Sequence, residues 1–102
     1  MTREEYEFMR NARGTLRTVA VTGPAVELIG SSPYRIAVLL FPSVDGNYEV
    51  GDGPQGTTWF AVPSGGVPVE LLLEKVGDLV QQPLWVRSSG AVTVAFVETV
   101  VR

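Results

Sequence analysis

The alternation of apolar and polar positions predicts short β-strands over most of the chain. From residue 15 onward the side chains follow a period of two, as in 15–21 and 26–28, which is the spacing of a half-buried strand. Residues 34–41 are apolar at nearly every position, which favours a strand buried between two layers. Turns rich in Gly and Pro separate further strands over 48–50, 57–62, 84–88 and 91–101. The pattern is that of an all-β protein.

The number and spacing of these segments indicate the architecture. About eight short strands at regular spacing predict an antiparallel β-sandwich, jelly-roll-like, formed as one domain by residues 15–102. The last two strands flank the turn at residues 88–90 and are predicted to pair as a hairpin. Residues 67–73 fit either an edge strand or the start of a helix, because Pro68 weakens a strand while 71–76 have helical character.

Residues 1–14 are more polar than the body and are predicted to form a short N-terminal arm or helix. Thr2 with Glu5 three positions later fits a capping box, and Gly14 can end a helix. A helix this short is marginal in water, so it needs a surface to dock on; a frayed terminus is the alternative. We expect the arm to contact a partner through Tyr6, Phe8, Met9, Arg10 and Arg13.

Composition narrows the chemistry that the chain can perform. It contains no His and no Cys, which removes the usual neutral-pH general base, the commonest metal ligand and any thiolate. The formal charge of −3 disfavours a nucleic-acid partner, and the apolar runs are too short to span a bilayer. We therefore expect no enzyme, no cofactor, no metal, and neither nucleic acid nor membrane as partner.

Two loop motifs are better explained by turns than by ligand sites. Residues 51–56 spell G-x-G-x-x-G, but Pro54 interrupts the motif and a β-rich segment follows where a dinucleotide site needs a helix. Asp45, Asn47 and Glu49 match the first spacings of a calcium loop, but Val50 occupies the position that requires Gly.

Catalytic groupings are equally weak. No spacing pairs the carboxylates, and the turn serines have no His as base. The residues considered are Glu27, Glu49, Glu70, Glu98, Ser64 and Ser89.

The aromatic residues leave two interpretations open. Trp59, Trp85, Tyr34 and Tyr48 either fill the core of the sandwich or form a platform for a sugar. If Trp59 faces inward, Thr58 and Phe60 face outward, and an exposed Phe60 would mark a subunit interface. Phe60 is therefore a further candidate for partner binding.

The order of the β-turn-β segments resembles that of small virion structural proteins of tailed bacteriophages, over roughly residues 18–98. The segments are VAVTG (19–23) with VEL (26–28), SPYR (32–35), YEVG (48–51), FAVP (60–63) leading through GG (65–66) to VEL (69–71), LWV (84–86) and SGAVTV (89–94). Two departures are a Gly-Gly-Val-Pro turn at 65–68 and an arm without a counterpart.

The resemblance implies a capsid decoration (cement) protein or a head-spike base, located on the capsid surface of a virion assembled in the host cytoplasm. It implies a symmetric homo-oligomer, a homotrimer or similar ring, in contact with the major capsid protein or another virion protein. The alternatives are a carbohydrate- or receptor-binding module that uses Trp59, Trp85 or Tyr48, and a tail or neck component.

Overall fold

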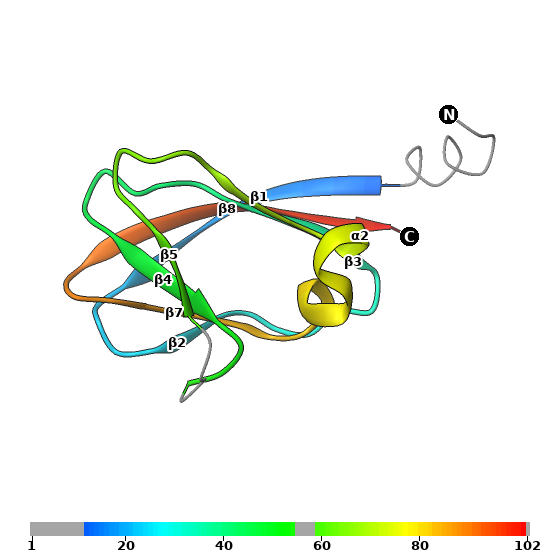
Figure 1. Cartoon of the computed structure of the whole chain (residues 1–102), viewed down its shortest axis with the longest axis horizontal. Helices are drawn as coiled ribbons and strands as arrows, with labels where there is room; N and C mark the ends of the chain where they lie inside the picture. Colours follow the sequence, from blue (N-terminus) through cyan, green and yellow to red (C-terminus); the bar gives the residue numbers. More distant parts are fainter. Residues whose placement is uncertain (1–11, 55–58, 102) are drawn as a thin grey trace.

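The chain folds as two antiparallel four-stranded sheets packed face to face (Figure 1). The computed structural model describes residues 12–54 and 59–101. The described strands are β1 (Ala12–Val21), β2 (Val26–Ile29), β3 (Arg35–Leu40), β4 (Tyr48–Gly51), β5 (Trp59–Val62), β6 (Val69–Leu72), β7 (Leu84–Ser88) and β8 (Val92–Val101). A helical turn, α2 (Leu73–Val76), and a 3-10 helix, η1 (Gly77–Gln81), join β6 to β7.

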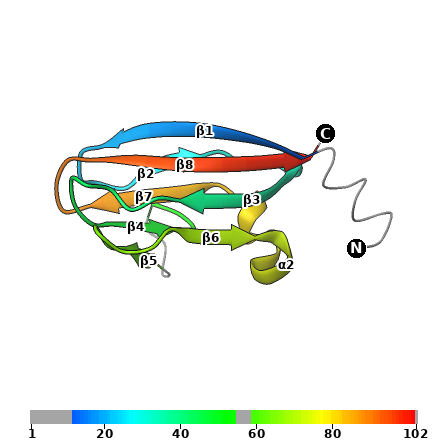
Figure 2. The ribbon, with the colours of Figure 1, turned by 90° about the horizontal axis from the view of Figure 1, so that it is seen from above.

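The order of the strands is that of a jelly roll. Sheet A has the order β1-β8-β3-β6, which Figure 2 shows side by side, and sheet B has the order β2-β7-β4-β5. Within the described residues, β4 and β5 are the only consecutive strands that share a sheet, so most connections cross from one sheet to the other. The predicted all-β sandwich of about eight strands is confirmed.

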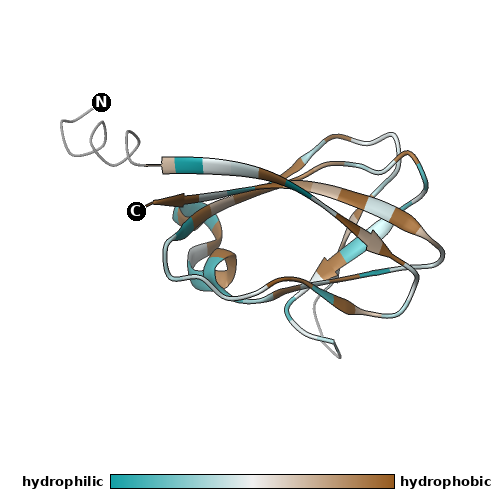
Figure 3. Ribbon diagram, turned by 180° about the vertical axis from the view of Figure 1, so that it is seen from behind, coloured by the Kyte–Doolittle hydropathy of each residue, from teal (hydrophilic) through white to brown (hydrophobic). Residues whose placement is uncertain are grey.

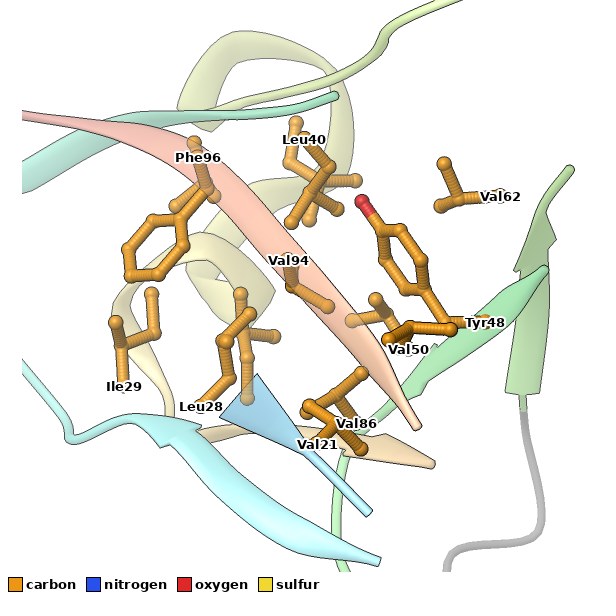
Figure 4. Close-up of a cluster of buried hydrophobic side chains, with 14 of the residues drawn as sticks. Val21, Leu28, Ile29, Leu40, Tyr48, Val50, Val62, Val86, Val94 and Phe96 are labelled. Atoms are coloured by element: carbon orange, nitrogen blue, oxygen red, sulfur yellow. The ribbon is translucent and has the colours of Figure 1, made fainter. Parts of the chain in front are cut away.

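The core lies between the sheets and is filled from both of them (Figure 4). Val38, Leu40, Val94 and Phe96 are buried from sheet A, and they face Tyr48 and other residues of sheet B. The Tyr48 hydroxyl donates a hydrogen bond of 2.6 Å to the Phe41 carbonyl, so the one polar atom of that side chain is satisfied. Burial of this apolar set holds the two sheets at a fixed separation.

Two local predictions need correction, and a third that was left open is resolved. The helix expected up to Arg13 and Gly14 does not extend there, because Ala12–Val21 form β1 and pair with β8; the earlier part of that helix lies outside the described residues. The expected hairpin of the last two strands is wrong, since β7 pairs with β2 and β4 and β8 pairs with β1 and β3. The ambiguous segment after residue 67 contains both alternatives, a strand followed by helical turns.

Candidate binding surfaces

Arg35, at the start of β3, is the centre of a buried polar cluster. Its side chain is 1% exposed. Its guanidinium donates hydrogen bonds to the Gly30 carbonyl and a Glu98 carboxylate oxygen, each at 2.8 Å, to the Gln82 carbonyl at 2.7 Å, and to the Val80 carbonyl. These partners come from the β2–β3 loop, β8, η1 and the residue after η1. Arg35 therefore ties both sheets together at one end of the sandwich.

The cluster uses four of the five guanidinium N–H donors of Arg35, and the side chain is buried. Glu98 is shared with Arg17, whose Nη1 lies 3.7 Å from the second carboxylate oxygen and whose side chain is 54% exposed. No buried side-chain nitrogen or oxygen of the described residues lacks a partner. The cluster is therefore a structural support for the surfaces described next, and no sequence pattern singled out Arg35.

The outer face of sheet A is apolar. Leu16, Val97 and Leu39 lie in one row across β1, β8 and β3, and Glu70 of β6 ends that row. Leu16 is 66% exposed, and Val97 and Leu39 are partly exposed. The neighbouring rows add the apolar Ala37, Leu72 and Ala95 and the polar Thr18 and Thr99. Figure 3 colours most of β8 as hydrophobic, which includes its buried residues Val92, Val94 and Phe96 as well as the outer ones. Within the described residues, Glu70 is the one charged side chain that the register places on this face.

The outer face of sheet B has a different composition. Trp85, Gly51 and Trp59 lie in one row across β7, β4 and β5, and Glu27 of β2 extends that row. The guanidinium carbon of Arg87 lies 4.1 Å from the centroid of the Trp59 ring. Both tryptophans are partly exposed on this face, so neither belongs to the buried core.

Phe60, predicted as a partner-binding residue if Trp59 faced inward, lies on the opposite face of β5. It pairs with Val50, which is fully buried, and it packs against the core. The expected orientations of Trp59 and Phe60 are thus reversed, because the pairing of β5 with β4 places Phe60 and Val62 inward. Phe60 is therefore only partly exposed, and its role as a contact residue remains a prediction.

The other predicted contact residues fall at the start of the chain. Arg13 is exposed on β1 and donates a hydrogen bond of 2.9 Å to the Ala12 carbonyl. Tyr6, Phe8, Met9 and Arg10 lie outside the described residues. Their role as contacts remains a prediction.

The side chains of the candidate calcium loop serve separate contacts. An Asp45 carboxylate oxygen accepts from the Thr93 amide at 3.2 Å, and the Asn47 side-chain oxygen accepts from the Ser64 amide at 2.7 Å. Glu49 accepts from Arg87 on the outer face of sheet B. No group of three His, Cys, Asp or Glu side chains close enough to hold a metal occurs among the described residues. Asp45 and Asn47 therefore brace loops, as the turn interpretation predicts, whereas Glu49 belongs to strand β4.

The two remaining aromatic candidates have opposite environments. Tyr34 is 64% exposed in the turn before β3, whereas Tyr48 is 1% exposed in the core. Burial raises the pKa of Tyr48 from its ordinary value of 10.0 to about 12. Of the four aromatic residues considered, Trp59 and Trp85 are therefore the pair that shares an accessible sheet face.

The raised pKa of Tyr48 predicts a loss of stability at alkaline pH. Between about pH 10 and pH 12 the unfolded chain releases the phenol proton that the native protein keeps. The stabilisation of the folded protein by the protonated Tyr48 is therefore complete below pH 10. As the pH rises it is lost, and the free energy of unfolding falls by about 3 kcal/mol in total. Urea unfolding over this range should show the decrease, and Tyr48→Phe should remove it. An equal decrease in Tyr48→Phe would assign the effect to other groups.

A pocket of about 250 Å³ opens at one end of the sandwich. Gly51, Asp52, Phe60 and Leu79 line it, so it lies between the β4–β5 end of sheet B and η1. Its volume is below the range typical of sites for small organic ligands, about 300–1,000 Å³.

No helix of the described residues has the length and apolarity needed to cross a bilayer.

Comparisons with known proteins show the fold and no family. No protein-family model and no curated protein matches the chain. The fold is similar to a Cupin_2 domain of an XRE-family transcriptional regulator from Enterobacter cloacae, with a TM-score of 0.53 and 11% identity over 86% of this chain and 95% of that one. It is also similar to a subunit of the disulfide-linked pili that form Bacillus endospore appendages, with a TM-score of 0.51 and 8% identity over 86% and 82%. At these identities the likeness establishes an all-β fold alone.

Proposed function

We propose that the protein is a structural component of a bacteriophage virion, a capsid decoration protein or head-spike base that acts through protein–protein contacts. The observation that carries the proposal is the apolar outer face of sheet A, with Leu16, Val97 and Leu39 in its central row. Extended apolar surfaces on small proteins mark interaction sites, and contacts between identical subunits are more apolar than other protein surfaces.

The face is small for a stable interface of its own. The strands of sheet A have ten, ten, six and four residues, so at a spacing of about 4.8 Å they span roughly 480 Å². Two such surfaces bury roughly 950 Å² together, below the value of about 1,200 Å² typical of stable interfaces, so contacts outside this face would have to add area. β1 is also an edge strand of ten residues that pairs only with β8 within its sheet, and assembly into a ring would cover this open edge.

The resemblance to phage virion proteins is the reason why we propose assembly into a virion and not into another kind of complex. The segments that carry it correspond in order to β1–β2, the start of β3, β4, β5–β6, and β7–β8. Jelly rolls are also a common fold of viral capsid proteins, which is an argument by analogy. A tail or neck component with the same fold is the alternative placement. Because this sequence has no Cys, its proposed subunit contacts cannot include disulfides, unlike the links of the pili named above.

The native mass of the full chain tests the proposal. Light scattering after size exclusion, over a range of concentrations, should show a homotrimer or another closed ring. A monomer that persists at the highest concentration would overturn the proposed assembly role.

A further inference from the structure

The outer face of sheet B presents two aromatic rings on either side of a residue without a side chain. Gly51 pairs with Trp59 on β5 and with Trp85 on β7, so the three residues form one row across adjacent strands. Strand spacing separates the two tryptophan backbones by roughly 10 Å. Gly51 itself is buried, so the space between the indoles is covered and a ligand would meet the exposed parts of the rings.

The neighbouring row supplies polar groups in fixed positions. Arg87 donates from Nε to a Glu49 carboxylate oxygen at 3.1 Å, while its guanidinium stacks on Trp59. The side chains of Arg87 and Glu49 are 42% and 43% exposed. The terminal amino groups of Arg87 and the second carboxylate oxygen of Glu49 have no partner among the described residues. Donors and an acceptor are thus held beside the aromatic row.

This combination matches the chemistry of a carbohydrate. A pyranose ring has an apolar C–H face and, at its edge, hydroxyl groups that both donate and accept hydrogen bonds. Indole rings offer large apolar surfaces, and charged side chains make the stronger hydrogen bonds. We propose that the outer face of sheet B binds a glycan, with a pyranose stacked on Trp85 beside the Arg87-covered ring of Trp59 and its hydroxyls bonded to Arg87 and Glu49.

The position of the groups favours binding by a surface that is already formed. Trp59, Trp85, Arg87 and Glu49 all lie on paired strands, so little ordering is needed when the ligand arrives. Single-stranded nucleic acid also stacks on aromatic rings, but its phosphates require a basic groove. Here Glu27 and Glu49 flank the tryptophans and the chain carries a net charge of −3, which disfavours phosphate.

The alternative is that the stacked Arg87 only covers Trp59 and stabilises the sheet. If this face binds a glycan, the added sugar changes the tryptophan emission. If Arg87 only covers Trp59, the added sugar leaves the emission unchanged. Trp59 and Trp85 are the two tryptophans of the chain, so intrinsic fluorescence reports on this face without a label.

The experiment is a glycan-array screen of the full-length protein, followed by fluorescence titration with the methyl glycosides of glucose, galactose, mannose and N-acetylglucosamine and with any array hit. We expect a saturable change of emission with at least one sugar. Arg87→Gln should weaken binding by about tenfold or more, because a charge-assisted hydrogen bond is lost. Trp85→Ala should abolish it. Tyr34→Ala, which removes an exposed aromatic ring elsewhere, should leave the affinity unchanged.

Two results would overturn the proposal: the absence of binding to every sugar tested, or binding that is equal in Arg87→Gln and in the unmodified protein. Arg87→Gln changes an exposed side chain and so keeps the test valid if Trp85→Ala does not fold. The test is independent of the virion proposal, since glycan binding needs no particular oligomer.

Discussion

Replacing Arg35 by methionine is expected to lower the free energy of unfolding by about 3–5 kcal/mol, the range measured when one partner of a buried ion pair is removed. Methionine fills part of the space but donates no hydrogen bond. The buried Val80 carbonyl would lose its partner, which costs about 1–3 kcal/mol, and the carbonyls of the more exposed Gly30 and Gln82 would lose theirs at a smaller cost. For a domain of this size the midpoint of thermal unfolding should fall by roughly 15 to 30 °C.

Arg17→Met is the matched control for this change. Arg17 contacts the same carboxylate, that of Glu98, but its side chain is 54% exposed and the separation is 3.7 Å. Exposed pairs of this kind contribute about 0–1 kcal/mol, so Arg17→Met should unfold close to the unmodified protein. Chemical and thermal unfolding of both variants measure the difference. An Arg35→Met variant within about 1 kcal/mol of the control would contradict the bridging role of Arg35.

The importance of Arg35 could not be derived from the sequence. A single Arg before an apolar strand also occurs at the exposed end of many strands, and nothing local separates the two cases. Its carbonyl partners at Val80 and Gln82 are distant in the chain and approach it only because η1 packs beside the start of β3. Such contacts depend on the tertiary fold, which periodicity does not contain.

The strands themselves were largely predictable, because alternation and turn residues are local signals. The hairpin of the last two strands failed for a related reason. The turn at Ser88–Gly90 shows that the chain reverses, but it does not show whether the next strand joins the same sheet or the facing one. In a jelly roll the chain usually crosses to the other sheet, and the choice is made by the packing of the whole core.

The orientation of β5 illustrates how a candidate site can be assigned to the wrong face. Trp59 and Ala61 alternate with Phe60 and Val62, so either face of this strand is apolar and the pattern alone does not choose. The choice follows from the register, in which Val62 pairs with buried Tyr48. Sequence reasoning could name Trp59 and Trp85 as a possible platform. It could not place them on one row around Gly51.

Substituting Val97 by lysine is the second large effect we expect, and it acts on assembly. Val97 lies in the middle of the apolar row between Leu16 and Leu39. An ammonium group at the centre of an interface loses water without gaining a partner, which costs several kcal/mol. The dissociation constant of the oligomer should rise by about 100-fold or more, so that light scattering finds monomers where the unmodified protein is assembled.

Folding of the monomer should survive this change, because Val97 is already partly exposed and strand propensities span only about 1 kcal/mol. Circular dichroism checks the fold, and Leu16→Lys provides a second variant at an edge position that is 66% exposed. The matched control is Ala61→Lys, which places the same charge on the exposed outer face of sheet B, opposite Glu49. If Val97→Lys and Leu16→Lys assemble as the control does, the contact between subunits does not use the outer face of sheet A. Dissociation in both, with an unchanged mass in Ala61→Lys, would assign assembly to sheet A and leave the aromatic row of sheet B accessible in the oligomer.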